Sequence, residues 1–132
     1  RPVHIYHVRP ATGSLVKTTT RILPRVILRF EGADSGGTPF AFDVALDRLM
    51  TMPKGMVIGR AADQCELVVA HGTVSRRHAG LTFSGESLQI EDLGSTNGTA
   101  VNGKARVAGA AIPLRAGDKV RLGDVEVAIR QL

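Results

Sequence analysis

Three short motifs in this sequence combine groups that can bind a phosphate. They are Gly59-Arg60, then Ser75-Arg76-Arg77-His78, and then Ser95-Thr96-Asn97-Gly98. An arginine guanidinium keeps its charge across the physiological pH range and presents a planar fork of donors that matches two phosphate oxygens. Serine and threonine hydroxyls can donate further hydrogen bonds to the same group. The three motifs together predict a surface that binds a phosphate dianion.

Arg60, Ser75 and Thr96 are the candidate phosphate ligands among these residues. Charge-assisted hydrogen bonds of this kind contribute roughly 1.5–3 kcal/mol each. The backbone N–H groups of Gly94 and Gly98 are expected to approach the same anion, because a glycine-rich backbone can come close to a ligand.

The order and spacing of the motifs resemble the forkhead-associated domain, whose signature is a Gly-Arg, a Ser-x-x-His and an Asn-Gly in that order. The resemblance covers roughly residues 25–131. It implies a module for protein–protein interaction that reads phosphothreonine-bearing partners in Ser/Thr kinase signalling.

The resemblance also implies a role for each matching residue. Arg60 and Ser75 match the residues that hold the phosphate, and Thr96 matches one that assists them. Asn97 matches the asparagine that bonds the main chain of the bound peptide, and Arg76 stands where the family often places a polar side chain against the peptide. The residues expected to support the site structurally are Gly59, His78 and Gly98.

The elements that must position these residues are short strands. Apolar and polar residues alternate in brief segments that glycines and prolines separate. This pattern predicts an all-β fold, an antiparallel β-sandwich of two twisted sheets with ligand-binding loops at one end. The expected strands are 26–30, 40–44, 56–58, 66–69, 81–83, 88–90, 120–122 and 125–129. Residues 45–50 fit one helical turn or a continued strand, and Asn102-Gly103 is typical of a hairpin turn.

The composition fits a single domain without cofactor or metal. A chain of 132 residues with 43% apolar content can build one core. The lone cysteine, Cys65, excludes an internal disulfide framework and offers no metal-ligand pair, so we expect a reducing compartment, the cytoplasm. No apolar run approaches the ~20 residues that a bilayer span needs. The chain begins with an arginine, so we expect it to be a piece of a longer protein.

The net charge of +5 is concentrated at the N-terminal end. The first 29 residues hold six Arg or Lys and no acid, whereas the remainder holds eleven bases and twelve acids. We therefore divide the chain into a basic arm or linker, residues 1–24, and a forkhead-associated domain, residues 25–132. An alternative function is binding of nucleic acid or another acidic surface by the arm, with the domain as scaffold. The domain itself lacks a basic stripe with interleaved aromatic residues, so nucleic acid is not its expected partner.

An enzymatic function is not expected. Ser75, His78 and Asp92 are the ingredients of a hydrolase triad, but no Gly-x-Ser-x-Gly motif surrounds Ser75. The sequence also lacks a phosphate-binding Gly-x-x-x-x-Gly-Lys-Ser/Thr loop and an acidic cluster suited to magnesium.

Two further expectations concern the ligand. Thr19 and Thr20 lie in the basic arm, with an aliphatic residue three positions after each, so the phosphorylated arm is a candidate ligand for this chain or a neighbouring copy. Thr73 and Ala100 are the candidate positions that set specificity after the phosphothreonine.

Overall fold

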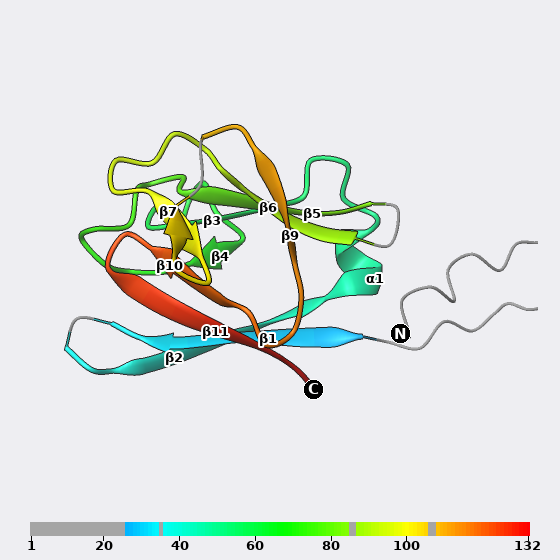
Figure 1. Ribbon diagram of the computed structural model, residues 1–132, viewed down its shortest axis with the longest axis horizontal. Helices are drawn as coiled ribbons and strands as arrows, with labels where there is room; N and C mark the ends of the chain where they lie inside the picture. Colours follow the sequence, from blue (N-terminus) through cyan, green and yellow to red (C-terminus); the bar gives the residue numbers. More distant parts are fainter. Residues whose placement is uncertain (1–25, 35, 85–86, 106–107) are drawn as a thin grey trace, which may run out of the picture.

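The computed structural model describes residues 26–34, 36–84, 87–105 and 108–132, which form two β-sheets packed against each other (Figure 1). One sheet consists of β1 (Ile27–Ala33), β2 (Pro39–Ala45), β7 (Thr99–Val101), β8 (Lys104–Ala105), β10 (Lys119–Leu122) and β11 (Val125–Gln131). The other consists of β3 (Met56–Gly59), β4 (Leu67–Val68), β5 (Ala79–Ser84), β6 (Ser87–Asp92) and β9 (Ala111–Leu114). The strand orders are β2-β1-β11-β10-β7-β8 and β4-β3-β5-β6-β9. The paired strands are antiparallel, apart from the parallel pair of β3 and β4.

The core between the sheets is built from the alternating apolar side chains of the strands. In β6, Leu88 and Ile90 are buried while Gln89 between them stays partly exposed. Aliphatic residues supply most of the core, and Phe30 adds a stack on Phe42 with 5.4 Å between the ring centroids. Because buried apolar area is the main stabilising term in folding, this core fixes the strand ends from which the loops depart.

The loops that follow β3, β4 and β6 lie at one end of the sandwich, together with the turn between β10 and β11 (Figure 1, left). The loops after β3, β4 and β6 carry the three sequence motifs. The strand β1 begins at the opposite end, so the chain before it joins the domain far from these loops (Figure 1).

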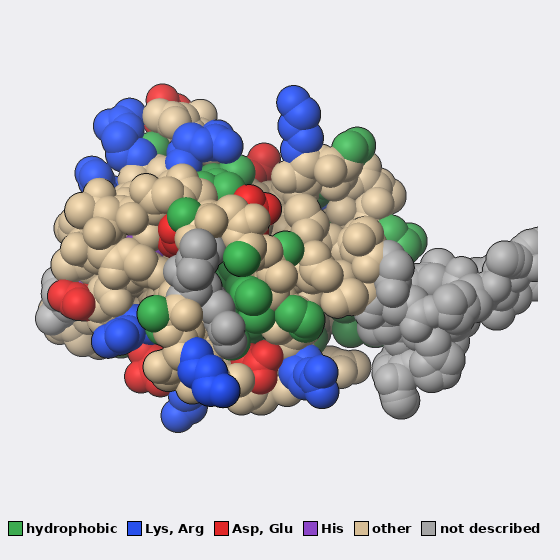
Figure 2. Space-filling model, turned by 45° about the horizontal axis from the view of Figure 1, so that its top comes forward, with side chains coloured by type: hydrophobic (Ala, Val, Ile, Leu, Met, Phe, Trp, Pro, Cys, Tyr) green, Lys and Arg blue, Asp and Glu red, His purple; other side chains and the backbone are tan. Residues whose placement is uncertain are grey.

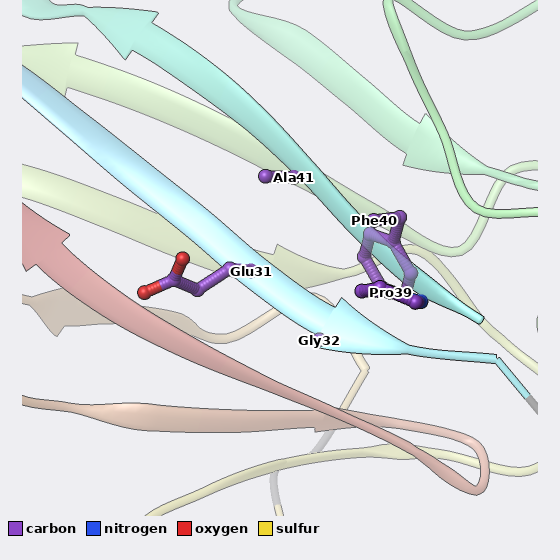
Figure 3. A pocket seen from close by; sticks show the side chains of 5 residues that line it. All are labelled: Glu31, Gly32, Pro39, Phe40 and Ala41. Atoms are coloured by element: carbon purple, nitrogen blue, oxygen red, sulfur yellow. The ribbon is translucent and has the colours of Figure 1, made fainter. Parts of the chain in front are cut away.

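A depression on the surface lies in the β1–β2 hairpin and is separate from the motif loops. Glu31 and Gly32 of β1 line it together with Pro39, Phe40 and Ala41 of β2 (Figure 3). The residues of the three motifs do not contribute to its lining. It is therefore not the surface that the sequence motifs predict.

The predicted all-β sandwich is confirmed, and each expected strand segment overlaps an observed strand. The strand β9 was not predicted, because Pro113 interrupts its short apolar run; a proline is tolerated there because β9 is the edge of its sheet. Residues 45–50 contain α1 (Leu46–Leu49), so the alternative of a continued strand is wrong. The Asn102-Gly103 turn is confirmed, with φ of 51° and 84° as a two-residue hairpin requires.

Candidate functional site

Two hydrogen bonds to the Val74–Ser75 segment hold Arg60 in place, one from its guanidinium and one from its backbone. Its Nε donates to the Val74 carbonyl oxygen at 2.8 Å, and its backbone N–H donates to the Ser75 carbonyl oxygen at 2.9 Å. The side chain is exposed, and its terminal nitrogens donate to no acceptor in the described ranges. The fork of the guanidinium is therefore positioned by the loop after β4 and remains open for two phosphate oxygens.

Ser75 keeps a hydroxyl proton that it can donate. Its Oγ accepts a hydrogen bond from the backbone N–H of Thr96 at 3.0 Å. Its own backbone N–H donates to Nδ1 of His78 at 3.0 Å. Since Oγ has only an acceptor role toward the described residues, the O–H is free to donate to an anion beside Arg60.

His78 is fully buried and joins two of the motif loops. Its Nδ1 accepts from the Ser75 backbone N–H, so Nε2 carries the proton and donates to the Gly98 carbonyl oxygen at 2.9 Å. Burial lowers the pKa of His78 from its ordinary value, although the hydrogen bond to Gly98 and the charge of Asp92 oppose that shift. The neutral ring is thus the form that braces the site.

The same contacts do not assemble a hydrolase triad. Nδ1 of His78 receives a backbone N–H of Ser75 and not its hydroxyl, and Nε2 faces Gly98 with the nearest carboxylate oxygen of Asp92 at 4.0 Å. A general base must accept the proton of the nucleophile. This histidine has no nitrogen free to do so.

Asp92 organises the loop after β6 from a buried position. Its carboxylate accepts the hydroxyls of Ser95 at 2.6 Å and Thr99 at 2.5 Å, and also the backbone N–H groups of Gly94 and Ser95. Burial raises the pKa of Asp92, but the hydrogen bonds from Ser95, Thr99 and Gly94 outweigh burial and hold the pKa below its ordinary value. The ionised carboxylate therefore fixes the loop that presents Thr96 and Asn97.

The expectation that the N–H groups of Gly94 and Gly98 face the anion is wrong. The Gly94 N–H donates to Asp92 at 3.0 Å, and the Gly98 N–H donates to Oγ of Ser95 at 2.9 Å. Both N–H groups therefore donate to acceptors within the 92–98 segment and not to a ligand. Gly98 is tied into the site through its carbonyl oxygen, which accepts from His78 and from the backbone N–H of Gly123 at 3.0 Å.

Thr96 and Asn97 are exposed at the tip of this loop. The backbone of Thr96 is bonded to Ser75, which brings its side chain beside the candidate phosphate ligands. Nδ2 of Asn97 donates to the Thr73 carbonyl oxygen at 2.9 Å. This bond orients the carboxamide and leaves Oδ1 as an acceptor for a peptide N–H.

Sequence reasoning missed the turn between β10 and β11 as part of the site. The backbone N–H of Asp124 donates to Oγ1 of Thr73 at 2.9 Å, and that hydroxyl is also 2.9 Å from Nδ1 of His71. A β-carbon at Gly123 would collide with the carbonyl oxygen of Thr73. The Gly-Asp pair is visible in the sequence as a turn, but nothing local indicates which loop it touches.

The two expected specificity positions do not offer free side chains to a ligand. The Thr73 hydroxyl already lies between the Asp124 amide and the ring of His71. Ala100 is 5% exposed and lies within β7. Neither placement supports a direct reading role for these side chains.

Gly59 supports the site through the absence of a side chain. A β-carbon there would collide with the carbonyl oxygen of Arg76 and would lie 2.8 Å from Sγ of Cys65. The same carbonyl oxygen accepts from the Cys65 thiol at 3.0 Å, and burial raises the pKa of that thiol. This close packing holds the Ser75–His78 loop against the end of β3.

The charge at this end of the molecule is mostly positive near the phosphate ligands. Arg60, Arg76 and Arg77 are exposed, and none of them pairs with a carboxylate among the residues that the structure describes. Figure 2 shows several basic side chains at the left end, where these loops lie. A dianion is therefore met by cationic side chains whose charge is not already neutralised.

The described residues contain no cluster of His, Cys, Asp or Glu that could hold a metal ion. Among the same residues, no helix is long and apolar enough to cross a membrane. Arg60, Ser75 and Thr96 come from three loops, and hydrogen bonds from Arg60 and Thr96 to the Val74–Ser75 segment bring them together.

Comparisons with known proteins find relatives that contain an FHA domain. FhaB, an FHA domain-containing protein of Mycobacterium tuberculosis strain H37Rv, is 37% identical over 83 residues, which are 63% of this chain and 52% of FhaB. The chain spans about half the length of the FhaB relatives that it matches.

Solved structures show the same sandwich. The FHA domain of FhaA, in complex with the intracellular domain of Rv3910, matches with a TM-score of 0.57 and 29% identity over 78% of this chain and 99% of that domain. A structure from an analysis of phosphothreonine-dependent FHA domain interactions matches with a TM-score of 0.57 and 30% identity over 81% of this chain and 96% of the other. The FHA domain family profile matches residues 56–123, just over half of the chain. The chain therefore belongs to the FHA domain family.

Proposed function

We propose that this chain binds partner proteins through a phosphothreonine and that Arg60, Ser75, Arg76, Thr96 and Asn97 form the binding surface. The role is recognition without catalysis, in kinase signalling in the cytoplasm. The FhaA domain in complex with a partner protein and the phosphothreonine-dependent FHA domain interactions of a second relative support this proposal.

The observation that carries the proposal is that Arg60, Ser75 and Asn97 each use some polar atoms for bonds within the protein and leave others unbonded among the described residues. Arg60 uses Nε and Ser75 uses an acceptor lone pair for internal bonds, and both keep donors directed to the surface. Asn97 uses one amide proton on Thr73 and keeps its Oδ1. A phosphate needs donors, and a peptide N–H needs an acceptor, so the free groups match a phosphorylated peptide.

The direct test is calorimetric titration with one peptide in three forms, carrying phosphothreonine, phosphoserine or plain threonine. We expect roughly micromolar affinity for the phosphothreonine form, about −8 kcal/mol, and no binding of the plain form. One buried threonine methyl contributes about 0.8 kcal/mol, so the phosphoserine form should bind about fourfold more weakly. Equal affinities for the phosphorylated and plain peptides would contradict the proposal.

We also propose that the basic arm, when phosphorylated at Thr19 or Thr20, is a ligand for this site. The arm lies outside the described residues, but its point of attachment is known, because β1 starts at the end remote from the loops (Figure 1). Thr20 lies seven positions before Ile27, and seven extended residues reach at most about 25 Å. The seven-residue strand β1 by itself spans about 23 Å. Engagement within one chain would need a fully stretched linker, which favours the site of a neighbouring copy.

Synthetic peptides spanning residues 14–24, phosphorylated singly at Thr19 or Thr20, test the recognition step. They should bind the whole unphosphorylated chain, and an Arg60→Ala chain should not bind them. Light scattering of a chain phosphorylated at these threonines should then show association that rises with protein concentration. Absence of binding for both peptides would remove the arm as a ligand.

A further inference from the structure

Asp124 is an acidic residue in the β10–β11 turn, which borders the candidate site. Its backbone N–H donates to Oγ1 of Thr73 at 2.9 Å, and the carbonyl oxygen of Thr73 accepts from Asn97. Gly123 packs closely against the same carbonyl oxygen and donates its own N–H to the Gly98 carbonyl oxygen. These contacts fix the turn to the loop after β4, which contains Thr73, and to the loop after β6, which contains Gly98.

Asp124 has no cationic partner in the part of the chain that the structure describes. The residue is exposed, and within the described ranges no Arg, Lys or His forms an ion pair with it. On the other side of Thr73, the chain continues through Val74 to Ser75 and the exposed Arg76. Exposed cations thus follow Thr73 along the chain, and an exposed acidic residue lies on the turn that is bonded to Thr73.

We infer that Asp124 is a specificity-determining residue that selects a lysine or arginine in the peptide near the phosphothreonine. The inference rests on the proposed function, because a peptide that Asn97 holds by its main chain passes beside the β10–β11 turn. A positive side chain of the peptide there meets an unpaired carboxylate, and an acidic side chain meets a like charge.

The basic arm of this chain carries a matching pattern. Arg21 follows Thr20 directly and lies two residues after Thr19, and Lys17 precedes both. The peptide class that Asp124 would select thus includes the chain's own candidate ligand.

The test uses alanine-based nine-residue peptides with a central phosphothreonine and a single Lys or Glu scanned through the other positions. Affinities are measured by fluorescence anisotropy for the whole chain and for Asp124→Asn and Asp124→Lys. Both substitutions keep the backbone N–H that bonds Thr73. Glu126→Gln is the matched control, because it removes one exposed negative charge from the adjacent strand β11.

In the unaltered chain we expect Lys to bind about two- to fivefold more tightly than Glu at one or two adjacent positions, as is typical of an exposed ion pair. Asp124→Asn should abolish that preference, Asp124→Lys should reverse it, and Glu126→Gln should retain it. Raising the salt concentration should weaken it.

The inference is overturned if phosphorylated peptides bind but the ratio of Lys to Glu affinities is the same in Asp124→Asn as in the unaltered chain. If no phosphorylated peptide binds the unaltered chain, the proposed function fails and this inference fails with it. The two failures are therefore distinguished by the phosphothreonine peptide itself.

Discussion

At the scale of single residues, the site separates ligand groups from bracing groups. Arg60 and Ser75, the proposed phosphate ligands, each use one polar group internally and keep another that makes no bond to the described residues. His78 and Asp92 are buried, and their polar atoms bond only within the protein. Substitutions in the two classes should therefore have different signatures.

Arg60→Ala and Ser75→Ala should lose phosphopeptide binding while the fold is retained. Removing the guanidinium leaves the phosphate charge uncompensated, which costs roughly 2–5 kcal/mol of binding free energy. Calorimetry measures the affinity, and thermal unfolding measures the stability of each variant. Lys54→Ala is the control, since it removes one exposed charge that precedes β3 and makes no hydrogen bond within the described ranges. A large drop in the unfolding temperature of Arg60→Ala would identify the arginine as structural.

His78 should make stability depend on pH. Its pKa in the folded protein is lowered from 6.5, so the unfolded chain binds a proton more readily than the folded one. The stabilising contribution is complete above the unfolded pKa and is lost as the pH falls through the folded pKa. Asp92, whose pKa is also lowered, adds a loss of the same sign at more acidic pH.

Urea unfolding between pH 8 and pH 5 measures this effect. The free energy of unfolding of the unaltered chain should fall toward pH 5. His78→Gln should be less stable at pH 8 by about 2–4 kcal/mol, because the buried ring is lost, the Ser75 amide loses its acceptor and the Gly98 carbonyl oxygen loses one of its two donors. Its pH dependence should be flatter, because the titrating imidazole is gone. An equally steep dependence in the variant would show that another group titrates.

At the scale of elements, the sandwich supplies strand ends and the loops supply chemistry. The end of β3 lies directly under the Ser75–His78 loop, because the backbone N–H of His78 donates to the Ile58 carbonyl oxygen at 2.8 Å. Gly59 is the point of closest approach between the two. The geometry of the loop should therefore depend on this glycine.

Gly59→Ala should displace the loop and weaken phosphopeptide binding more than a surface change does. Its β-carbon would strike the Arg76 carbonyl oxygen, and such overpacking typically costs about 1–3 kcal/mol. Gly72→Ala is a matched control, since a β-carbon there meets no atom within 4 Å. Calorimetry and thermal unfolding of both variants provide the comparison. Unchanged affinity for Gly59→Ala would mean that the loop adapts without cost.

At the scale of the whole molecule, most of the net positive charge lies in residues 1–24, outside the segment that forms the candidate site. Residues 1–24 hold four of the basic residues and none of the acidic ones. Electrostatic attraction to an acidic polymer follows the number of cations that contact it and weakens with salt. The arm and the site should therefore be separable by substitution.

Replacing the four basic residues of the arm by glutamine should abolish any salt-sensitive binding of the chain to double-stranded DNA. The affinity for a phosphothreonine peptide unrelated to the arm should stay the same. Anisotropy titrations at two salt concentrations measure both. Loss of the phosphopeptide affinity in this variant would show that the arm contributes to the site.

The sequence alone predicted the sandwich and indicated the loops that the structure brings together in the candidate site. Alternating apolar residues encode strands because successive side chains in a strand point to opposite faces. The Asn102-Gly103 turn was equally legible, because the positive φ values of such a turn are a local property. The pattern also placed Arg60, Ser75 and Thr96 in loops after strands, which a sandwich can gather at one end.

Only the tertiary structure decided which groups of those loops remain free. The amides of Gly94 and Gly98 are consumed by Asp92 and Ser95, whereas the Ser75 hydroxyl proton is left for a ligand. The backbone of Asp124 contacts Thr73, which lies 51 positions earlier in the sequence. Such contacts depend on the packing of the two sheets and on which donors and acceptors of each loop pair within the protein. The apolar periodicity of a single segment predicts neither the sheet packing nor the hydrogen-bond pairing of the loops, because both involve segments that meet only after folding.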